Sequence, residues 1–167
     1  VEGDAEFAEW TARILAYLDA PRVLSLRAGK LEVDDIPADQ LDVIERPFFR
    51  MGVKWSATGN SLTVPGQQKL RVKNDLGAAI PKIEDGIWPS FPSDLMSVCI
   101  VLATQTRGTA LFFEKMFESR MYFVDHLMAM GANIIQCDPH RVIVTGPAVL
   151  HGTHLSSPDI RAGMAML

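Results

Sequence analysis

The stretch FPSDLMSVCIVLA, from Phe91 to Ala103, contains the strongest structural signal in the chain. Its last nine residues are almost all apolar, a composition typical of a helix buried on every side. Asp94 stands directly before this run, where the first backbone N–H groups of a helix lack partners and the helix dipole is positive. The sequence therefore predicts a buried helix over residues 94–105 with a carboxylate at its start.

The arrangement recurs at SPDIRA, residues 157–162, where Asp159 again precedes an apolar run. Between the two aspartates lies FESR, residues 117–120, at the start of another amphipathic segment. Together they predict a charged site built from helix starts, with Asp94, Arg120, Asp159 and Arg161 as candidates.

Each candidate has a structural alternative. Aspartate is among the best helix N-caps, so Asp94 alone, or Asp159 together with Arg161, would serve as a cap. Arg120 has the alternative of a solvated arginine that packs only its stem. The residue types by themselves leave these alternatives open.

An internal repeat organises the chain into units of helix, strand, helix, strand, strand. Gly52 and Gly131 each follow a methionine at the end of a helical pattern and are predicted to end the helix as left-handed C′ residues. We expect a first unit at residues 1–74, a second at 75–150 and the start of a third at 151–167, all in one domain. The expected helices cover 6–18, 38–51, 94–105 and 119–130, and the expected strands include 31–33, 61–66, 110–113 and 141–146.

Composition narrows the class of protein. The chain has 167 residues, 48% of them hydrophobic, and a net charge of −4, which argues against a broad nucleic-acid surface. No apolar run is long enough to span a bilayer, and no signal-peptide pattern is present. The two cysteines, Cys99 and Cys137, fit a reducing compartment, and nothing resembles a disulfide framework or a zinc site. Because the chain begins at Val1 and ends inside an apolar run at Leu167, we expect a piece of a longer protein.

These motifs, in this order, resemble those of the enolpyruvyl transferases. The resemblance is to the carboxy-terminal half of the UDP-N-acetylglucosamine 1-carboxyvinyltransferases, whose motifs read approximately F-P-T-D, F-E-N-R and T-D-[LI]-R-A. The chain departs from them at Ser93, Ser119 and Pro158. The resemblance implies an α+β fold of the inside-out α/β barrel type, with helices inside, sheets outside and three units in each of two domains. This chain would be most of one domain, and its partner would be the other domain of the same protein.

The resemblance also implies an activity: transfer of the enolpyruvyl group of phosphoenolpyruvate to the 3-hydroxyl of UDP-N-acetylglucosamine, with release of phosphate, for peptidoglycan synthesis in the cytoplasm. No cofactor or metal is expected, nor a membrane or nucleic-acid partner. The family's catalytic cysteine lies in the other domain, so neither Cys99 nor Cys137 inherits that role, and this chain alone is expected to be inactive.

For individual residues, the resemblance implies that Asp94 contacts the acceptor sugar and acts as the base. It implies that Arg120 clamps phosphoenolpyruvate, that the main chain of Met116 contacts the acceptor, and that Asp159 and Arg161 order the cleft. Two alternatives stay open: a related transferase with another acceptor, such as shikimate 3-phosphate, or a non-catalytic binding module on the same fold.

Overall fold

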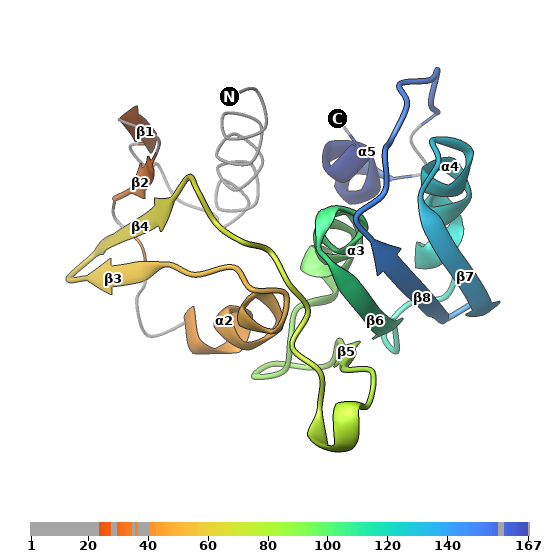
Figure 1. Ribbon diagram of the computed structural model, residues 1–167, viewed down its shortest axis with the longest axis horizontal. Coiled ribbons are helices and arrows are strands. Elements are labelled where there is room, and N and C mark those ends of the chain that lie inside the picture. Colours follow the sequence, from red (N-terminus) through yellow and green to blue (C-terminus); the bar gives the residue numbers. More distant parts are fainter. Residues whose placement is uncertain (1–23, 28–29, 35, 37–40, 157–158, 167) are drawn as a thin grey trace.

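The computed structural model describes residues 24–27, 30–34, 36, 41–156 and 159–166, and shows two four-stranded sheets with helices between and beside them (Figure 1). The helix predicted over residues 6–18 lies outside the described residues. No helix among those described is both long and apolar enough to cross a membrane.

The N-terminal sheet is antiparallel throughout and has the strand order β1-β2-β4-β3. Its strands are β1 (Leu24–Arg27), β2 (Lys30–Val33), β3 (Ser56–Thr58) and β4 (Ser61–Pro65). Apolar residues alternate along β2 and β4, so that one face of this sheet is buried. A small core forms there, made of Leu31, Val33, Ile36, Leu41, Leu62 and Val64.

The C-terminal sheet has the corresponding order, β5-β6-β8-β7. Its strands are β5 (Lys82–Glu84), β6 (Gly108–Phe113), β7 (Asn133–Asp138) and β8 (Arg141–Gly146). The first pair, β5 and β6, is parallel, whereas the first pair of the N-terminal sheet is antiparallel. The two sheets thus share their strand order but not every strand direction.

Five of the described helical segments are four residues or longer. They are α2 (Leu41–Arg50), α3 (Met96–Gln105), the 3₁₀ turn η4 (Arg120–Phe123), α4 (Val124–Ala129) and α5 (Ile160–Met166). Two shorter 3₁₀ turns are η2 (Leu76–Ala78), between β4 and β5, and η3 (Ser93–Leu95), between β5 and α3.

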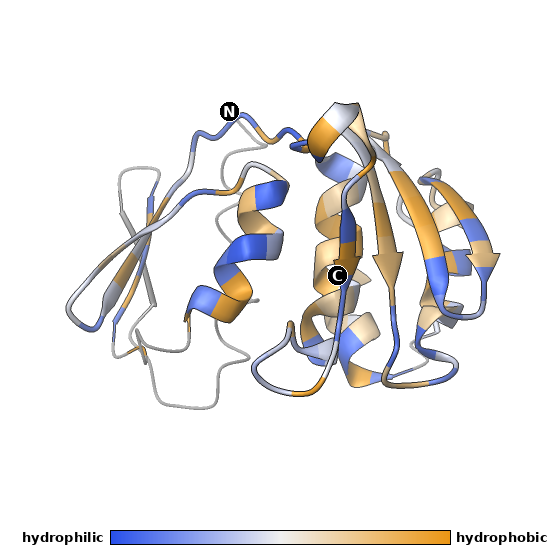
Figure 2. Ribbon diagram, turned by 90° about the horizontal axis from the view of Figure 1, so that it is seen from below, coloured by the Kyte–Doolittle hydropathy of each residue, from blue (hydrophilic) through white to orange (hydrophobic). Residues whose placement is uncertain are grey.

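Helix α3 forms the centre of the main core. Eight of its ten residues are buried, and it packs against β6, β8 and α5. Apolar colours dominate α3 and the neighbouring strands, whereas α2 shows an alternation of polar and apolar residues (Figure 2). Phe48 of α2 reaches the same core, where its ring lies 6.4 Å from that of Phe91. The mixed α+β class predicted from the sequence is confirmed.

Two glycines end helices as predicted. Gly52 has φ +87° and Gly131 has φ +106°, both in the left-handed region. In each case the residue after the glycine donates its N–H back across five positions, from Val53 to Phe48 and from Ala132 to Leu127. This is the Schellman arrangement, in which the last carbonyl groups of a helix find donors.

Two local predictions were wrong, and one strand was not predicted. The helix expected over residues 94–105 begins as the 3₁₀ turn η3 and becomes α-helical only at Met96. The helix expected over 119–130 divides into η4 and α4, after Ser119 in a left-handed conformation. Strand β5 was not predicted, because three residues are too few to show a periodic pattern.

Candidate active site

Three segments that are distant in sequence meet at the carboxylate of Asp94. Its Oδ1 lies 3.0 Å from Nη1 of Arg120 and 2.5 Å from Nε of Arg161. Asp94 comes from η3, Arg120 from the start of η4 and Arg161 from the first turn of α5. The structure therefore brings together three of the residues that the sequence singled out.

Arg120 is held on two sides. Its guanidinium carbon lies 4.2 Å from the centroid of the Phe117 ring, and its side chain is only 16% exposed. A flat guanidinium over an aromatic face is a favourable cation–π arrangement. The alternative of a solvated arginine is therefore wrong for Arg120.

The capping alternative holds for one aspartate and fails for the other. Oδ1 of Asp159 accepts hydrogen bonds from the backbone N–H groups of Arg161 (2.8 Å) and Ala162 (3.1 Å), so Asp159 caps α5. For α3, by contrast, the N-cap position is Leu95 and no side chain caps the helix. The carboxylate of Asp94 faces the two arginines instead.

Beside the cluster lies a small hollow whose walls come from five elements or their connections. Its lining residues are Ser93, Met96, Ser97, Glu114, Arg120, Met121, Phe123, Asp159 and Arg161. Oγ of Ser97 is buried and has no hydrogen-bond partner among the described residues. A buried hydroxyl without a partner is costly, so this oxygen is available to a bound molecule or to water.

Met116 is 40% exposed and is not among the residues that line the hollow. Its N–H donates to Oε1 of Glu114 at 3.2 Å, and that of Phe117 does the same at 3.2 Å. The segment that leads to Arg120 is therefore folded around the Glu114 side chain.

Sequence reasoning missed Glu114 and its neighbour Asp85. Both are buried, with exposures of 0% and 1%. Burial, together with a hydrogen bond to Asp85, raises the pKa of Glu114 to about 7. A carboxylate that directly follows a buried strand, as Glu114 follows β6, was the available signal, but it reads equally as the start of a surface loop.

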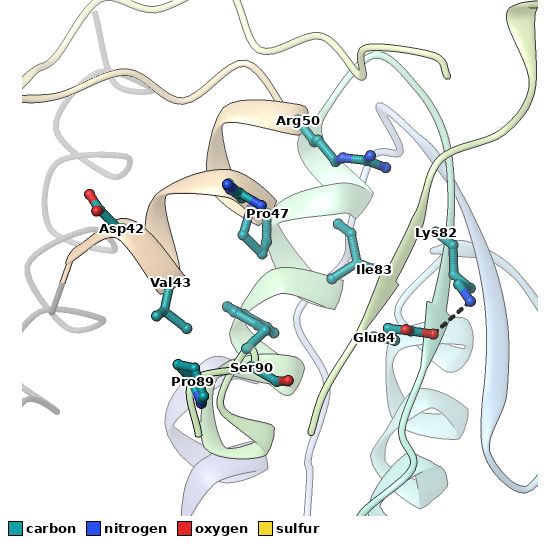
Figure 3. A pocket seen from close by; sticks show the side chains of 11 residues that line it. Asp42, Val43, Pro47, Arg50, Lys82, Ile83, Glu84, Pro89 and Ser90 are labelled. Carbon is teal, nitrogen blue, oxygen red and sulfur yellow. Dashed lines mark ion pairs between the residues drawn. The ribbon is translucent and has the colours of Figure 1, made fainter. Parts of the chain in front are cut away.

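A larger groove of about 560 Å³ lies away from this cluster, between α2 and residues 82–91 (Figure 3). Lys82 lines this groove and pairs with Glu84 at 2.6 Å. Arg50 also lines it and pairs with Asp75 at 3.0 Å. Lys82 is therefore not part of the Asp94 cluster.

The cysteines and possible metal ligands stand apart from the site. Cys99 is buried in α3, and burial raises the pKa of its thiol well above the ordinary value, as expected for inert packing. Cys137 is exposed on β7. Within the described part of the chain, no group of three or more His, Cys, Asp or Glu residues is placed to hold a metal ion.

The chain is similar to known proteins that share one name. The chain is 49% identical over 154 residues to the UDP-N-acetylglucosamine 1-carboxyvinyltransferase of Treponema denticola, a match that covers 90% of this chain and 36% of that protein. It is 47% identical over 171 residues to the protein of the same name from Bradyrhizobium diazoefficiens, covering 100% of this chain and 40% of that protein. The chain thus spans well under half the length of these relatives.

Among solved structures, the enolpyruvyl transferase NikO from Streptomyces tendae has the same fold. The TM-score is 0.66 at 22% identity, over 81% of this chain and 30% of that chain. The family model described as EPSP synthase (3-phosphoshikimate 1-carboxyvinyltransferase) matches residues 24–167, which include every residue of the Asp94 cluster. The chain therefore belongs to the EPSP synthase family.

Proposed function

We propose that the full-length protein containing this chain transfers the enolpyruvyl group of phosphoenolpyruvate to the 3-hydroxyl of UDP-N-acetylglucosamine and releases phosphate. The observation that carries the proposal is the Asp94–Arg120–Arg161 cluster. It lies within a chain that is 49% and 47% identical to two proteins named for this reaction. That identity favours UDP-N-acetylglucosamine over shikimate 3-phosphate as the acceptor.

Asp94 is the proposed base. A sugar hydroxyl is a poor nucleophile until its proton is removed, and a carboxylate within hydrogen-bonding reach contributes about 10²–10⁴-fold to such a step. The hydroxyl oxygen bonds to C2 of phosphoenolpyruvate while its proton passes to Asp94 and C3 gains a proton. The C2–O bond to phosphate then breaks, and C3 loses a proton to restore the double bond. The family resemblance assigns the acid for C3 to the other domain.

Arg120 and Arg161 are the proposed anion clamp. Phosphoenolpyruvate carries a carboxylate and a phosphate, and the planar guanidinium fork suits both groups. The two guanidinium groups converge on one carboxylate, so they lie close enough to hold one small dianionic molecule.

Met116 and Asp159 have supporting roles in the proposal. Because the N–H of Met116 already donates to Glu114, a main-chain contact with the acceptor would use its carbonyl oxygen. Asp159 fixes the first turn of α5 and with it the backbone of Arg161. The hollow has room for about one water molecule, to which the unpartnered Oγ of Ser97 offers a hydrogen bond.

The proposal includes the finer architecture. Residues 1–74, 75–150 and 151–167 would be two units and the start of a third in an inside-out α/β barrel, and the shared strand order of the two sheets supports this division. The other domain of the same protein would close the cleft. Both proposed substrates are charged molecules that do not cross a membrane unaided, so we place this step of peptidoglycan synthesis in the cytoplasm.

The test is phosphate release from phosphoenolpyruvate by the full-length protein, measured with UDP-N-acetylglucosamine, with shikimate 3-phosphate and without acceptor. We expect release with UDP-N-acetylglucosamine alone, and none from the isolated 167-residue chain. Release with shikimate 3-phosphate instead would assign the alternative acceptor. No release with either would favour the non-catalytic binding module.

A further inference from the structure

Two buried carboxyl groups lie beneath the proposed site and take no direct part in it. Asp85 follows β5 and Glu114 follows β6. The two strands are parallel, with Glu84 opposite Phe113, and the N–H of Asp85 continues the ladder by donating to the carbonyl of Phe113 (3.3 Å). Asp85 and Glu114 therefore leave the sheet at the same edge, side by side.

The hydrogen bonds of Glu114 link it to both halves of the site. The hydroxyl of Ser93 lies 2.9 Å from each of its carboxyl oxygens, and Ser93 is the residue directly before Asp94. Its Oε1 also accepts from the N–H groups of Met116 and Phe117. Phe117 in turn supports the guanidinium of Arg120.

If both groups are ionised, one carboxylate oxygen of Asp85 lacks a hydrogen-bond donor among the described residues. Its Oδ1 accepts from the N–H of Lys115 at 2.5 Å. Its Oδ2 is buried and has no donor among the described residues. Two carboxylates in contact and out of water repel each other, whereas one proton between them supplies the missing donor and removes one charge.

We propose that Asp85 and Glu114 share one proton, and that this singly charged pair is a positioning device that holds Ser93–Asp94 and Met116–Arg120 in place. The positioning half of the inference depends on the proposed transferase function, and the shared proton does not. The raised pKa of Glu114, caused first by burial and then by its hydrogen bond to Asp85, agrees with the geometry.

The charged groups around the pair decide what happens when the shared proton is lost. Arg120, Asp159 and Arg161 line the same hollow as Glu114. The positive charge of Arg120 lowers the pKa of Glu114 but does not outweigh burial. Nδ1 of His140 contacts the main-chain carbonyl of Glu114 at 3.0 Å. Lys115 is engaged by Glu84 at 3.1 Å.

A second negative charge on the pair would therefore compete with Asp94 for Arg120. It would also push apart the two segments that the pair connects. Turnover should fall as the pH rises above about 7, the value to which the pKa of Glu114 is raised.

The kinetic test uses Glu114→Gln in the full-length protein, because an amide keeps the shape, remains uncharged and donates to Asp85. This variant should keep turnover near pH 6 and should not show the decline that the wild type shows above about pH 7. Glu114→Ala should lose about tenfold or more in kcat at every pH, since misplacing a reacting group by about 1 Å is enough to cost 10²-fold. Asp125→Asn, a change at an exposed carboxylate on α4, is the matched control and should leave the profile unchanged.

A spectroscopic test follows the proton without relying on activity. Infrared difference spectra of the wild type should show the carbonyl stretch of a protonated carboxyl group that disappears as the pH rises through about 7. The band should be absent from Glu114→Gln. A missing band in the wild type, or an unchanged band in the variant, would refute the shared proton.

The kinetic test and the spectroscopic test can fail independently of each other. A pH profile of Glu114→Gln that superimposes on the wild type would refute the positioning role even if the band behaves as expected. A wild type without transferase activity would remove the proposed function and the positioning role together. The spectrum would still decide whether the proton is shared.

Discussion

Replacing Asp94 by asparagine separates a structural role from a catalytic one. The change keeps the size of the side chain and one carbonyl oxygen, but removes the negative charge that pairs with Arg120 and Arg161. The side chain of Asp94 is 38% exposed and that of Arg161 is 37% exposed. An ion pair at such solvent-accessible positions contributes about 0–1 kcal/mol. Arg120 is only 16% exposed, but the side-chain oxygen of asparagine still accepts its hydrogen bond. Stability should therefore fall by no more than roughly 1–2 kcal/mol.

The expected effect on turnover is much larger. Asparagine cannot accept the proton of the sugar hydroxyl, and a positioned base contributes about 10²–10⁴-fold. At 1.36 kcal/mol for each factor of ten, the activation barrier should rise by about 3–5 kcal/mol. The barrier should thus change more than the free energy of unfolding, which is the comparison that the experiment needs.

The assay is kcat for phosphate release together with a urea unfolding curve, both on the full-length protein. Asp75→Asn is the matched control, because it removes a half-exposed aspartate–arginine pair, with Arg50 at 3.0 Å, away from the Asp94 cluster. The control should lose a similar small amount of stability and retain its turnover. Near-normal kcat in a folded Asp94→Asn protein would refute the assignment of Asp94 as the base.

Four further outcomes follow from the structure. Arg120→Lys should raise KM for phosphoenolpyruvate far more than KM for the acceptor, because the guanidinium fork and its stacking on Phe117 are lost. The expected loss in binding free energy for phosphoenolpyruvate is roughly 1–3 kcal/mol. Steady-state kinetics with both constants unchanged would contradict the clamp. Ser119→Gly should stabilise the protein by about 0.5–1 kcal/mol in urea unfolding, because Ser119 has φ +67° and a left-handed conformation costs a side chain roughly 1–2 kcal/mol; a lower urea midpoint would refute this. Gly146→Ala should destabilise the protein by roughly 1–3 kcal/mol in the same assay, because a Cβ there would meet the carbonyl oxygens of Ala103 and Thr106, and an unchanged midpoint would refute it. Folding raises the pKa of Glu114 from 4.5 to about 7. Between these pH values the folded protein keeps a proton that the unfolded chain releases, so the free energy of unfolding should fall as the pH rises. Glu114→Gln should flatten this decline.

The parts of the fold that the sequence predicted are those with local signals. Helix α2 and the ends at Gly52 and Gly131 follow from helical spacing and from a residue that tolerates positive φ. The buried character of α3 follows from its unbroken apolar run.

The wrong local predictions concern choices that depend on tertiary contacts. Asp94 was a plausible cap, but two arginines from η4 and α5 hold its carboxylate outside the capping geometry. Strand β5 exists because β6 offers it a partner, since three residues have no periodicity of their own. No pattern along the chain encodes either contact.

Only part of the site was predicted, because the rest of it depends on tertiary contacts. Asp94, Arg120 and Arg161 were singled out by residue type and by family resemblance, and the structure brings their side chains together. Glu114 and Asp85 were missed because only their proximity in the folded protein indicates a function. Each alone reads as a polar residue at the end of a strand, and only the parallel register of β5 and β6 puts the two carboxyl groups in contact.

The topology also explains why this charged cluster is anchored well. Asp94 is attached to α3, whose buried residues hold it against β6 and β8, so the backbone at this position is fixed by the main core. Arg120 and Met116 lie on an exposed segment, but Glu114, fully buried at the end of β6, accepts from the backbone of that segment and from Ser93. The exposed half of the site is thus tied to the buried half through one side chain. It follows that the protonation state of Glu114 should matter more to the geometry of the cluster than any exposed charge around it.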